Sequence, residues 1–123
     1  MATRANIVIR STGRTYWLYH HWDGYPSYLG AKLGDFLMGN KDDIDSIATQ
    51  LIKGVALEDD GFELTNFRHL DIEWLYEINV AENKLYVFRT TPFDGVQRSE
   101  LLYEFDWMSE EEAKKFKEFC EKN

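Results

Sequence analysis

The feature that most constrains the fold is a long alternation of apolar and polar residues from His69 to Val80. One set of alternate positions is apolar or aromatic and consists of Leu70, Ile72, Trp74, Tyr76, Ile78 and Val80. The positions between them include His69, Asp71, Glu73, Glu77 and Asn79. Because successive side chains of a strand point to opposite faces, this period of two predicts a long strand with one buried face.

Four further strands are expected from local sequence. Residues 6–10 and 14–20 are β-prone runs joined by Ser11-Thr12-Gly13, which is typical of a hairpin. Ala81-Glu82-Asn83 is expected to turn the chain back into a strand over residues 85–89. A last alternating strand has its apolar positions at Leu101, Tyr103, Phe105 and Trp107.

Three helices are expected as well. Apolar residues at helical spacing predict helices over residues 29–37 and 44–55. Gly30 and Gly34 lie four residues apart in the first of these and would leave a smooth strip for close contact. Ser109-Glu110-Glu111-Glu112 is a capping-box sequence, in which the serine accepts a backbone hydrogen bond and the last glutamate reaches back. It predicts the start of a C-terminal helix.

The predicted order of elements is β-β-α-α-β-β-β-α. Consecutive strands joined by short turns pair antiparallel, and helices grouped between runs of strands are typical of the α+β class. We therefore expect residues 1–123 to form a single α+β domain. Its antiparallel sheet would contain about five strands, with the helices packed on one face.

Composition excludes several classes of protein. Apolar residues make up 44% of the chain and aromatic residues 15%, which is enough for a packed core. No apolar run approaches the roughly 18–20 residues that a membrane helix needs. The single cysteine, Cys120, excludes an internal disulfide and a cysteine-based zinc site. We expect a soluble protein of a reducing compartment.

Charge is unevenly distributed along the chain, whose net charge is −8. Residues 1–34 contain four basic residues and one acidic residue, whereas residues 56–82 contain one basic residue and eight acidic ones. A surface built from the second segment would repel a phosphate backbone, so general binding to nucleic acid is disfavoured. Such a surface can meet a basic protein, or it can be a solvated face that keeps a small domain soluble.

The densest group of polar and aromatic residues is Tyr19-His20-His21-Trp22-Asp23-Gly24-Tyr25-Pro26. Functional residues are often found on loops that a rigid scaffold positions. The candidate binding residues are His20, His21, Trp22, Asp23 and Tyr25, with Arg89 as a further contact for an anionic group. Adjacent histidines in a continuing strand point to opposite faces. A purely structural interpretation also remains open, in which Asp23-Gly24 is an ordinary turn pair and the rings cover the edge of the sheet.

No catalytic or metal-ligating pattern was found. His20, His21 and His69 lack the spacing of a zinc site. Asp71 and Glu73 would lie about 7 Å apart on one strand face, near the separation of paired carboxylates in glycosidases, but many acidic strands share that spacing. We therefore predict no catalytic residue, no metal and no cofactor.

The segment Leu18–Pro26 resembles one found in small proteins of tailed phages and prophages. In those proteins a basic or aromatic strand leads into His-Trp-Asp-Gly-Tyr-Pro and then into a helix rich in glycine and leucine. Asp71–Ile78 is similar to a second segment of the same proteins, an aromatic strand that begins with aspartate. The resemblance implies a phage or prophage accessory protein that acts in the cytoplasm of a bacterial host, and it supplies no activity.

These observations predict a non-enzymatic accessory protein that binds a host component through an acidic surface, for example as a counter-defence inhibitor. A second hypothesis is a binding protein that captures a nucleotide signal. Aromatic rings of the loop would then stack on a base, and a histidine or Arg89 would contact phosphate. A third hypothesis is a component of the virion or of its assembly. The predicted partners are thus a host protein or a small nucleotide, without a membrane, and a homo-oligomer is left open.

Overall fold

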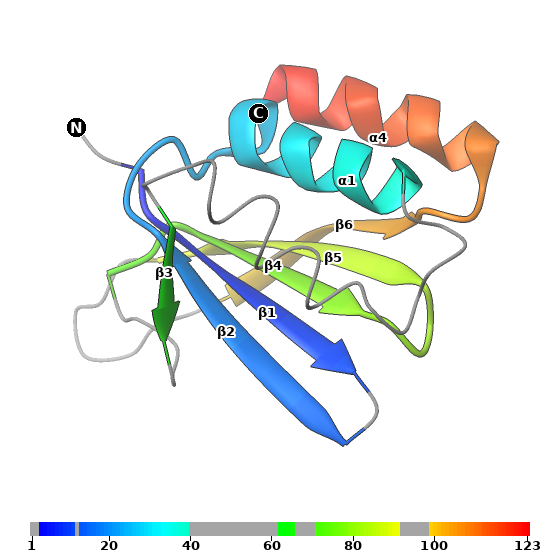
Figure 1. Cartoon of the computed structure of the whole chain (residues 1–123). Coiled ribbons are helices and arrows are strands. Elements are labelled where there is room, and N and C mark those ends of the chain that lie inside the picture. The colour runs from blue at the N-terminus through cyan, green and yellow to red at the C-terminus, as the bar shows by residue number, and fades with distance from the viewer. Residues whose placement is uncertain (1–2, 12, 40–61, 66–70, 92–98) are drawn as a thin grey trace.

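The computed structural model describes residues 3–11, 13–39, 62–65, 71–91 and 99–123. Over these residues six strands form one sheet, and two α-helices lie side by side on one of its faces (Figure 1). The strands are β1 (Ala5–Ser11), β2 (Arg14–His20), β3 (Phe62–Thr65), β4 (Trp74–Asn79), β5 (Lys84–Thr90) and β6 (Ser99–Asp106). The helices are α1 (Ala31–Gly39), which follows the π-helical turn η1 (Pro26–Gly30), and α4 (Glu110–Lys122).

The sheet is mixed, with the spatial order β3-β2-β1-β4-β5-β6. All neighbouring strands pair antiparallel except β1 and β4, which are parallel. The α+β class is confirmed, but the prediction of a purely antiparallel sheet was wrong. That prediction rested on short turns between consecutive strands. Since β1 and β4 are far apart in the chain, no turn constrains their relative direction.

The N-terminal hairpin was predicted correctly. Ser11 pairs with Arg14, so two residues connect β1 to β2. One of them, Gly13, has φ of 70°, a left-handed conformation that glycine adopts at little cost. The strand β3 was not predicted, and it pairs with β2 at one edge of the sheet. The helix predicted over residues 44–55 lies outside the described residues.

The strand predicted from His69 to Val80 is shorter than its alternation suggested. It begins at Trp74, and His69 lies outside the described residues. Ile72 is buried with Val8 and Leu75, on the face opposite to the one that Trp74 occupies. The prediction that Ile72 shares the face of Trp74 was therefore wrong, because residues 71–73 are not strand and do not continue the alternation.

A β-bulge interrupts β6. Val87 pairs with Tyr103, whereas its neighbour Phe88 pairs with Leu101, so Leu102 is an extra residue on the bulged strand. Leu101 is therefore not on the face that Tyr103 shares, and 49% of it is exposed. The expectation that alternation would bury it with Tyr103 was wrong, because an inserted residue reverses the parity of the positions before it.

The main core lies between the sheet and the two α-helices. Gly34 of α1 faces Phe116 of α4 so closely that a Cβ at position 34 would lie 2.7 Å from the phenylalanine ring. The same ring stacks on Phe105 of β6, with centroids 4.4 Å apart and planes only 3° from parallel. The predicted role of Gly34 in a close helix contact is thus confirmed. The largest fully buried side chains of the core include Trp107, Tyr76, Phe105, Ile7 and Ile9.

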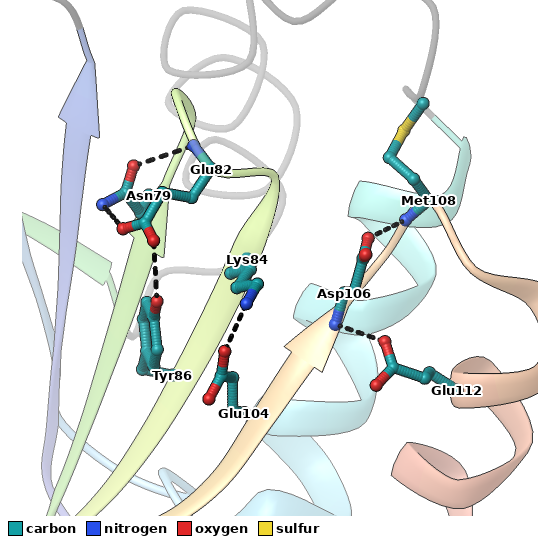
Figure 2. Close-up of polar contacts among 8 residues, drawn as sticks. All are labelled: Asn79, Glu82, Lys84, Tyr86, Glu104, Asp106, Met108 and Glu112. Atoms are coloured by element: carbon teal, nitrogen blue, oxygen red, sulfur yellow. Dashed lines mark hydrogen bonds and ion pairs between the residues drawn. The ribbon is translucent and has the colours of Figure 1, made fainter.

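The start of α4 matches its capping sequence in part. Ser109 is the N-cap residue, and its Oγ accepts a hydrogen bond of 3.4 Å from the backbone N–H of Glu112. The carboxylate of Glu112 does not accept a hydrogen bond from the backbone N–H of Ser109, as it would in a complete capping box. It accepts instead from the backbone N–H of Asp106 at 3.2 Å, and so ties the helix to the end of β6 (Figure 2).

The turn between β4 and β5 is held by side chains. The side-chain amide of Asn79 donates through its Nδ2 to the carboxylate of Glu82 at 2.6 Å, and its Oδ1 accepts from the backbone N–H of Glu82 at 3.1 Å (Figure 2). Asn83, the residue before β5, has φ of 58°, which asparagine tolerates better than most residues. Lys84 forms an ion pair across the sheet with Glu104 of β6.

Candidate functional site

The candidate site is the loop that leaves β2 and enters η1. His20 is the last residue of β2 and is buried, and its ring lies roughly parallel to that of Tyr28 at 6.3 Å between centroids. The ring of His21 meets Tyr19 edge-on at 4.7 Å. Tyr28 lies in η1, whereas Tyr19 is buried with Val8, Ile72 and Leu75. The two histidine rings thus contact different tyrosines. Because β2 ends at His20, the strand geometry behind the prediction of opposite faces does not extend to His21.

The second half of the loop, Gly24–Pro26, is fixed to the sheet, and we call it the pinned half. The backbone N–H of Gly24 donates to the carbonyl of Thr3 at 2.8 Å. Its carbonyl accepts from the hydroxyl of Tyr76 at 2.6 Å, in a buried hydrogen bond. A Cβ at position 24 would lie 2.7 Å from the Cβ of Ala5. Glycine is therefore required here by a close backbone approach rather than by its freedom in φ.

Asp23 stabilises the turn that leads into the pinned half. Its φ is 52°, in the left-handed region that aspartate enters more readily than most residues. Its Oδ1 accepts a hydrogen bond of 3.1 Å from the hydroxyl of Tyr25. This hydrogen bond to a carboxylate raises the pKa of Tyr25, with a smaller contribution from burial. Asp23 and Tyr25, both predicted as binding residues, are thus engaged with each other.

The first half of the loop exposes the side chain of Trp22, whereas His21 and Asp23 are half-buried. Trp22 is 44% exposed and Tyr28, which follows in η1, is 40% exposed. The ring of Trp22 lies 5.9 Å from that of His21 and 6.4 Å from that of His20. Lys32 of α1 places its Nζ 5.4 Å from the centroid of the Tyr28 ring. We call His21, Trp22 and Tyr28 the aromatic patch, in which the ring of His20 is the common neighbour of Trp22 and Tyr28. Tyr28 was not predicted as a binding residue, because it lies between the segment that ends at Pro26 and the helix predicted over residues 29–37.

Arg89 shares a row of the sheet with the loop but is not part of the aromatic patch. The row runs from His20 through Ala5 and Trp74 to Arg89, so two strands separate the residues at its ends. Three strand spacings correspond to roughly 14 Å. The guanidinium of Arg89 lies over the ring of Trp74 at 4.8 Å, and 3.8 Å from the carboxylate of Glu73. The predicted contribution of Arg89 to the same site is therefore not supported by its position.

Several carboxylates of the acidic segment pair with arginines. The ion pairs are Arg4–Asp71 at 3.4 Å, Arg89–Glu73 at 3.8 Å and Arg10–Glu77. Asp71 also accepts a hydrogen bond of 3.2 Å from the hydroxyl of Tyr19. Asp71 and Glu73 thus have separate cationic partners, an arrangement unlike a pair of catalytic carboxylates acting on one bond. Residues 56–61 and 66–70 of this segment lie outside the described residues.

Two further groups bear on chemistry. Cys120 is buried, and this burial, aided by the nearby charge of Asp35, raises the pKa of its thiol to about 12. A thiol with so high a pKa is a poor nucleophile at neutral pH. Within the part of the chain that the structure describes, no group of three or more histidine, cysteine or acidic residues gathers as metal ligands.

None of the helices in the described ranges is long and apolar enough to cross a membrane. A scan against protein-family models found no match, and searches of curated proteins and of solved structures found none either.

Proposed function

We propose that the protein is a non-enzymatic binding protein that recognises a partner protein through the aromatic patch of His21, Trp22 and Tyr28. The observation that supports this most is the exposure of Trp22, which is 44% open to solvent beside a half-loop held by buried hydrogen bonds. Tryptophan and tyrosine at rigid, exposed positions are the side chains that most often dominate the binding energy of protein interfaces. A loop with a fixed backbone also loses little conformational entropy on binding.

We further propose that the partner is a component of a bacterial host, so that the protein acts as a phage or prophage accessory protein. The resemblance of Leu18–Pro26 to phage segments supports this, and a counter-defence inhibitor would act by occupying a surface of its target. The proposal does not depend on the charge of residues 56–82. Three carboxylates of that segment already form ion pairs within the protein.

The hypothesis of a nucleotide-binding protein has less support. Tyr19 and His20, which would stack on a base or contact phosphate, are buried. Arg89 is held over Trp74, two strands away from the loop. Of the groups that this hypothesis requires, Trp22 and His21 lie close together in the loop, whereas Arg89 does not join them.

The experiment compares wild-type protein with Trp22→Ala and with Met108→Ala. Met108 is a matched control, because it is 45% exposed and lies in the turn between β6 and α4 rather than in the loop. Each protein is immobilised and exposed to bacterial lysate, and a retained protein is then purified and titrated. We expect wild type and Met108→Ala to bind it with the same Kd, and Trp22→Ala to bind at least about 30-fold more weakly, as at a hot spot.

Equal binding by Trp22→Ala would contradict a role for the aromatic patch. A parallel thermal-shift screen against cyclic and linear nucleotides tests the other hypothesis, because a ligand that binds only the folded state raises Tm. If no protein is retained but a nucleotide raises Tm, the nucleotide hypothesis replaces the proposal. If neither result is obtained, both are rejected.

A further inference from the structure

The strand β6 lies at one edge of the sheet, and among the described residues its only neighbouring strand is β5. Residues 99–102, at its start, are exposed, and they include two adjacent leucines, Leu101 at 49% and Leu102 at 37%. An exposed edge strand that carries apolar side chains is a template for pairing with another strand. The outer edge of β6 is therefore a candidate docking surface.

The β-bulge determines which side chains this edge presents together. Because Leu102 is an extra residue, Leu101 and Glu104 lie on the same face of the sheet although an odd number of positions separates them. Leu101 pairs with Phe88, which in turn pairs with the buried Leu75. An apolar row thus crosses the face opposite to the helices and ends at an exposed leucine, and a strand added beside β6 would continue it.

Backbone groups of β6 point away from β5 along this edge. The N–H of Asp106 donates to the carboxylate of Glu112 in α4 at 3.2 Å, so it faces outward (Figure 2). Outward-facing groups recur at every second residue of an antiparallel pair, so the N–H and C=O of Glu104 face outward as well. Within the described part of the chain, α4 occupies the edge at Asp106, and residues 99–104 are open to another strand.

The side chains of β6 define what a strand on its outer side would meet. With the bulged Leu102 left aside, successive rows of the edge present Glu100, Leu101, Tyr103 and Glu104. Tyr103 is half-buried and the other three are exposed. Opposite charges and apolar pairs on neighbouring strands stabilise a sheet, whereas like charges directly opposite each other destabilise it. A matching strand therefore has two adjacent apolar positions with a basic residue on either side.

We propose that the edge of β6 binds an extended segment of a partner protein whose residues follow the order basic-apolar-apolar-basic. In such strand addition the backbone hydrogen bonds provide affinity and the alternate side chains provide specificity. The inner neighbour β5 has the same complementarity in part, since Arg89 lies opposite Glu100 and Phe88 opposite Leu101. The order reads the same from both ends, so it does not depend on the direction of the partner strand.

The acidic residues of the edge disfavour a second copy of this chain as its occupant. An antiparallel pair of β6 strands that matches the two apolar rows would place Glu100 of each chain opposite Glu104 of the other. Like charges in that position are destabilising, and charged side chains on edge strands prevent self-pairing. The strands β1, β4 and β5 separate this edge from β2 and the loop with the aromatic patch, so the inference does not depend on the proposed function.

The test uses a peptide of eight residues, the length of β6, with the sequence Thr-Thr-Lys-Val-Val-Lys-Thr-Thr. A second peptide, Thr-Thr-Val-Lys-Lys-Val-Thr-Thr, has the same composition and charge but places its lysines opposite Leu101 and Tyr103. In titration calorimetry at low ionic strength we expect the first peptide to bind saturably, with one peptide per chain. The second should bind at least about tenfold more weakly. Hydrogen exchange measured by NMR should show slower exchange of the Glu104 amide in the complex, because its N–H then donates to the added strand.

Two double variants test the contribution of charge at the edge. Glu100→Gln/Glu104→Gln should weaken binding of the first peptide by about tenfold or more. Glu110→Gln/Glu111→Gln is the matched control, because both glutamates are exposed in the first turn of α4 and do not belong to the edge. It changes the net charge by the same amount and should leave Kd nearly unchanged.

The proposal is overturned if the first peptide shows no saturable binding up to about 1 mM, at the weak end of specific affinities. Equal binding of the two peptides, an equal loss in the two double variants, or unchanged exchange of the Glu104 amide would overturn it as well. A dimer of the protein alone in sedimentation, with slow exchange of the same amide, would show that a second copy occupies the edge instead. Should a variant fail to fold, as its Tm would show, the comparison of the two peptides on the wild-type protein still decides the question.

Discussion

The loop after β2 has two halves that differ in how the rest of the protein holds them. The pinned half is fixed by hydrogen bonds that join Gly24 to the backbone of Thr3 and to the side chain of Tyr76. Gly24 also lies so close to Ala5 that a Cβ at position 24 would overlap with the Cβ of Ala5. The other half presents Trp22 to solvent. Exposure and rigidity are therefore compatible in one short loop. An exposed ring can be held in a defined position by the residues that follow it.

The largest effect is expected from Gly24→Ala in the pinned half. A Cβ there would meet the Cβ of Ala5 at 2.7 Å and the carbonyl oxygen of Thr3 at 2.9 Å, so the backbone must shift. We expect a loss of about 2–3 kcal/mol in the free energy of unfolding, measured by urea denaturation. Gly39→Ala is the control, since nothing lies within 4 Å of its added methyl group, and its stability should be equal or slightly higher. Equal stability of the two variants would show that the half-loop is not pinned.

The next effect in size is expected from Tyr76→Phe. The hydroxyl of Tyr76 is buried and donates to the carbonyl of Gly24, and the same burial raises its pKa well above the usual value. Removing the donor leaves a buried carbonyl without this partner, which should cost about 1–2 kcal/mol in thermal or urea unfolding. Tyr86→Phe removes an exposed hydroxyl that contacts Glu82 and should cost less than about 0.5 kcal/mol. A difference of zero between these two variants would argue against the buried hydrogen bond.

A smaller effect is expected from Trp22→Ala. Because the side chain is 44% exposed, its truncation should lower the free energy of unfolding by only about 1 kcal/mol. Truncating a fully buried tryptophan costs roughly 3–5 kcal/mol. A urea melt separates the two cases, and a loss in the second range would place Trp22 in the structural part of the loop, contrary to its proposed role.

The smallest effect is expected from Asp23→Gly. This change removes the acceptor of the Tyr25 hydroxyl, but it also relieves the cost of a non-glycine residue at φ of 52°. The two contributions oppose each other, so the stability change should stay within about 0.5 kcal/mol. Asp23→Ala loses the acceptor without that relief and should be less stable than Asp23→Gly by about 1 kcal/mol. The reverse order would mean that the left-handed conformation is not retained in the protein.

The parts of the fold that sequence predicted are those set by local chemistry. The hairpin at Gly13, the N-cap at Ser109 and the close helix contact at Gly34 each follow from residues within a few positions of one another or from the size of one side chain. The parallel pairing of β1 with β4 and the bulge at Leu102 could not be predicted in this way. Pairing between distant strands depends on tertiary packing. The bulge is hidden in the sequence because Leu101 is apolar although it is exposed, so the alternation continues through the inserted residue.

In the candidate site, too, the features set by local sequence were predicted and those set by distant residues were not. The end of β2 at His20 was predicted from local sequence, since a strand was expected over residues 14–20. By contrast, the buried hydrogen bond from Tyr76 to Gly24 joins two residues far apart in the chain, and Tyr76 was predicted only as a core residue. The position of Arg89 depends on the order of strands in the sheet, and that order was not predicted. The residue types of the loop predicted where the candidate site lies. Which distant residues contact the loop depends on the topology of the sheet, which was not predicted.

The parallel pairing of β1 with β4 also has a consequence for the kinetics of folding. On one side of this junction β1 and β2 form a local hairpin, and on the other β4, β5 and β6 form an antiparallel meander. Each of these units closes only short loops, whereas joining them requires a contact between residues widely separated in sequence, such as Ala5 and Trp74. Closure of so long a loop costs more entropy, and non-local contacts slow folding. We therefore expect the two units to form early and their docking along β1 and β4 to limit the folding rate.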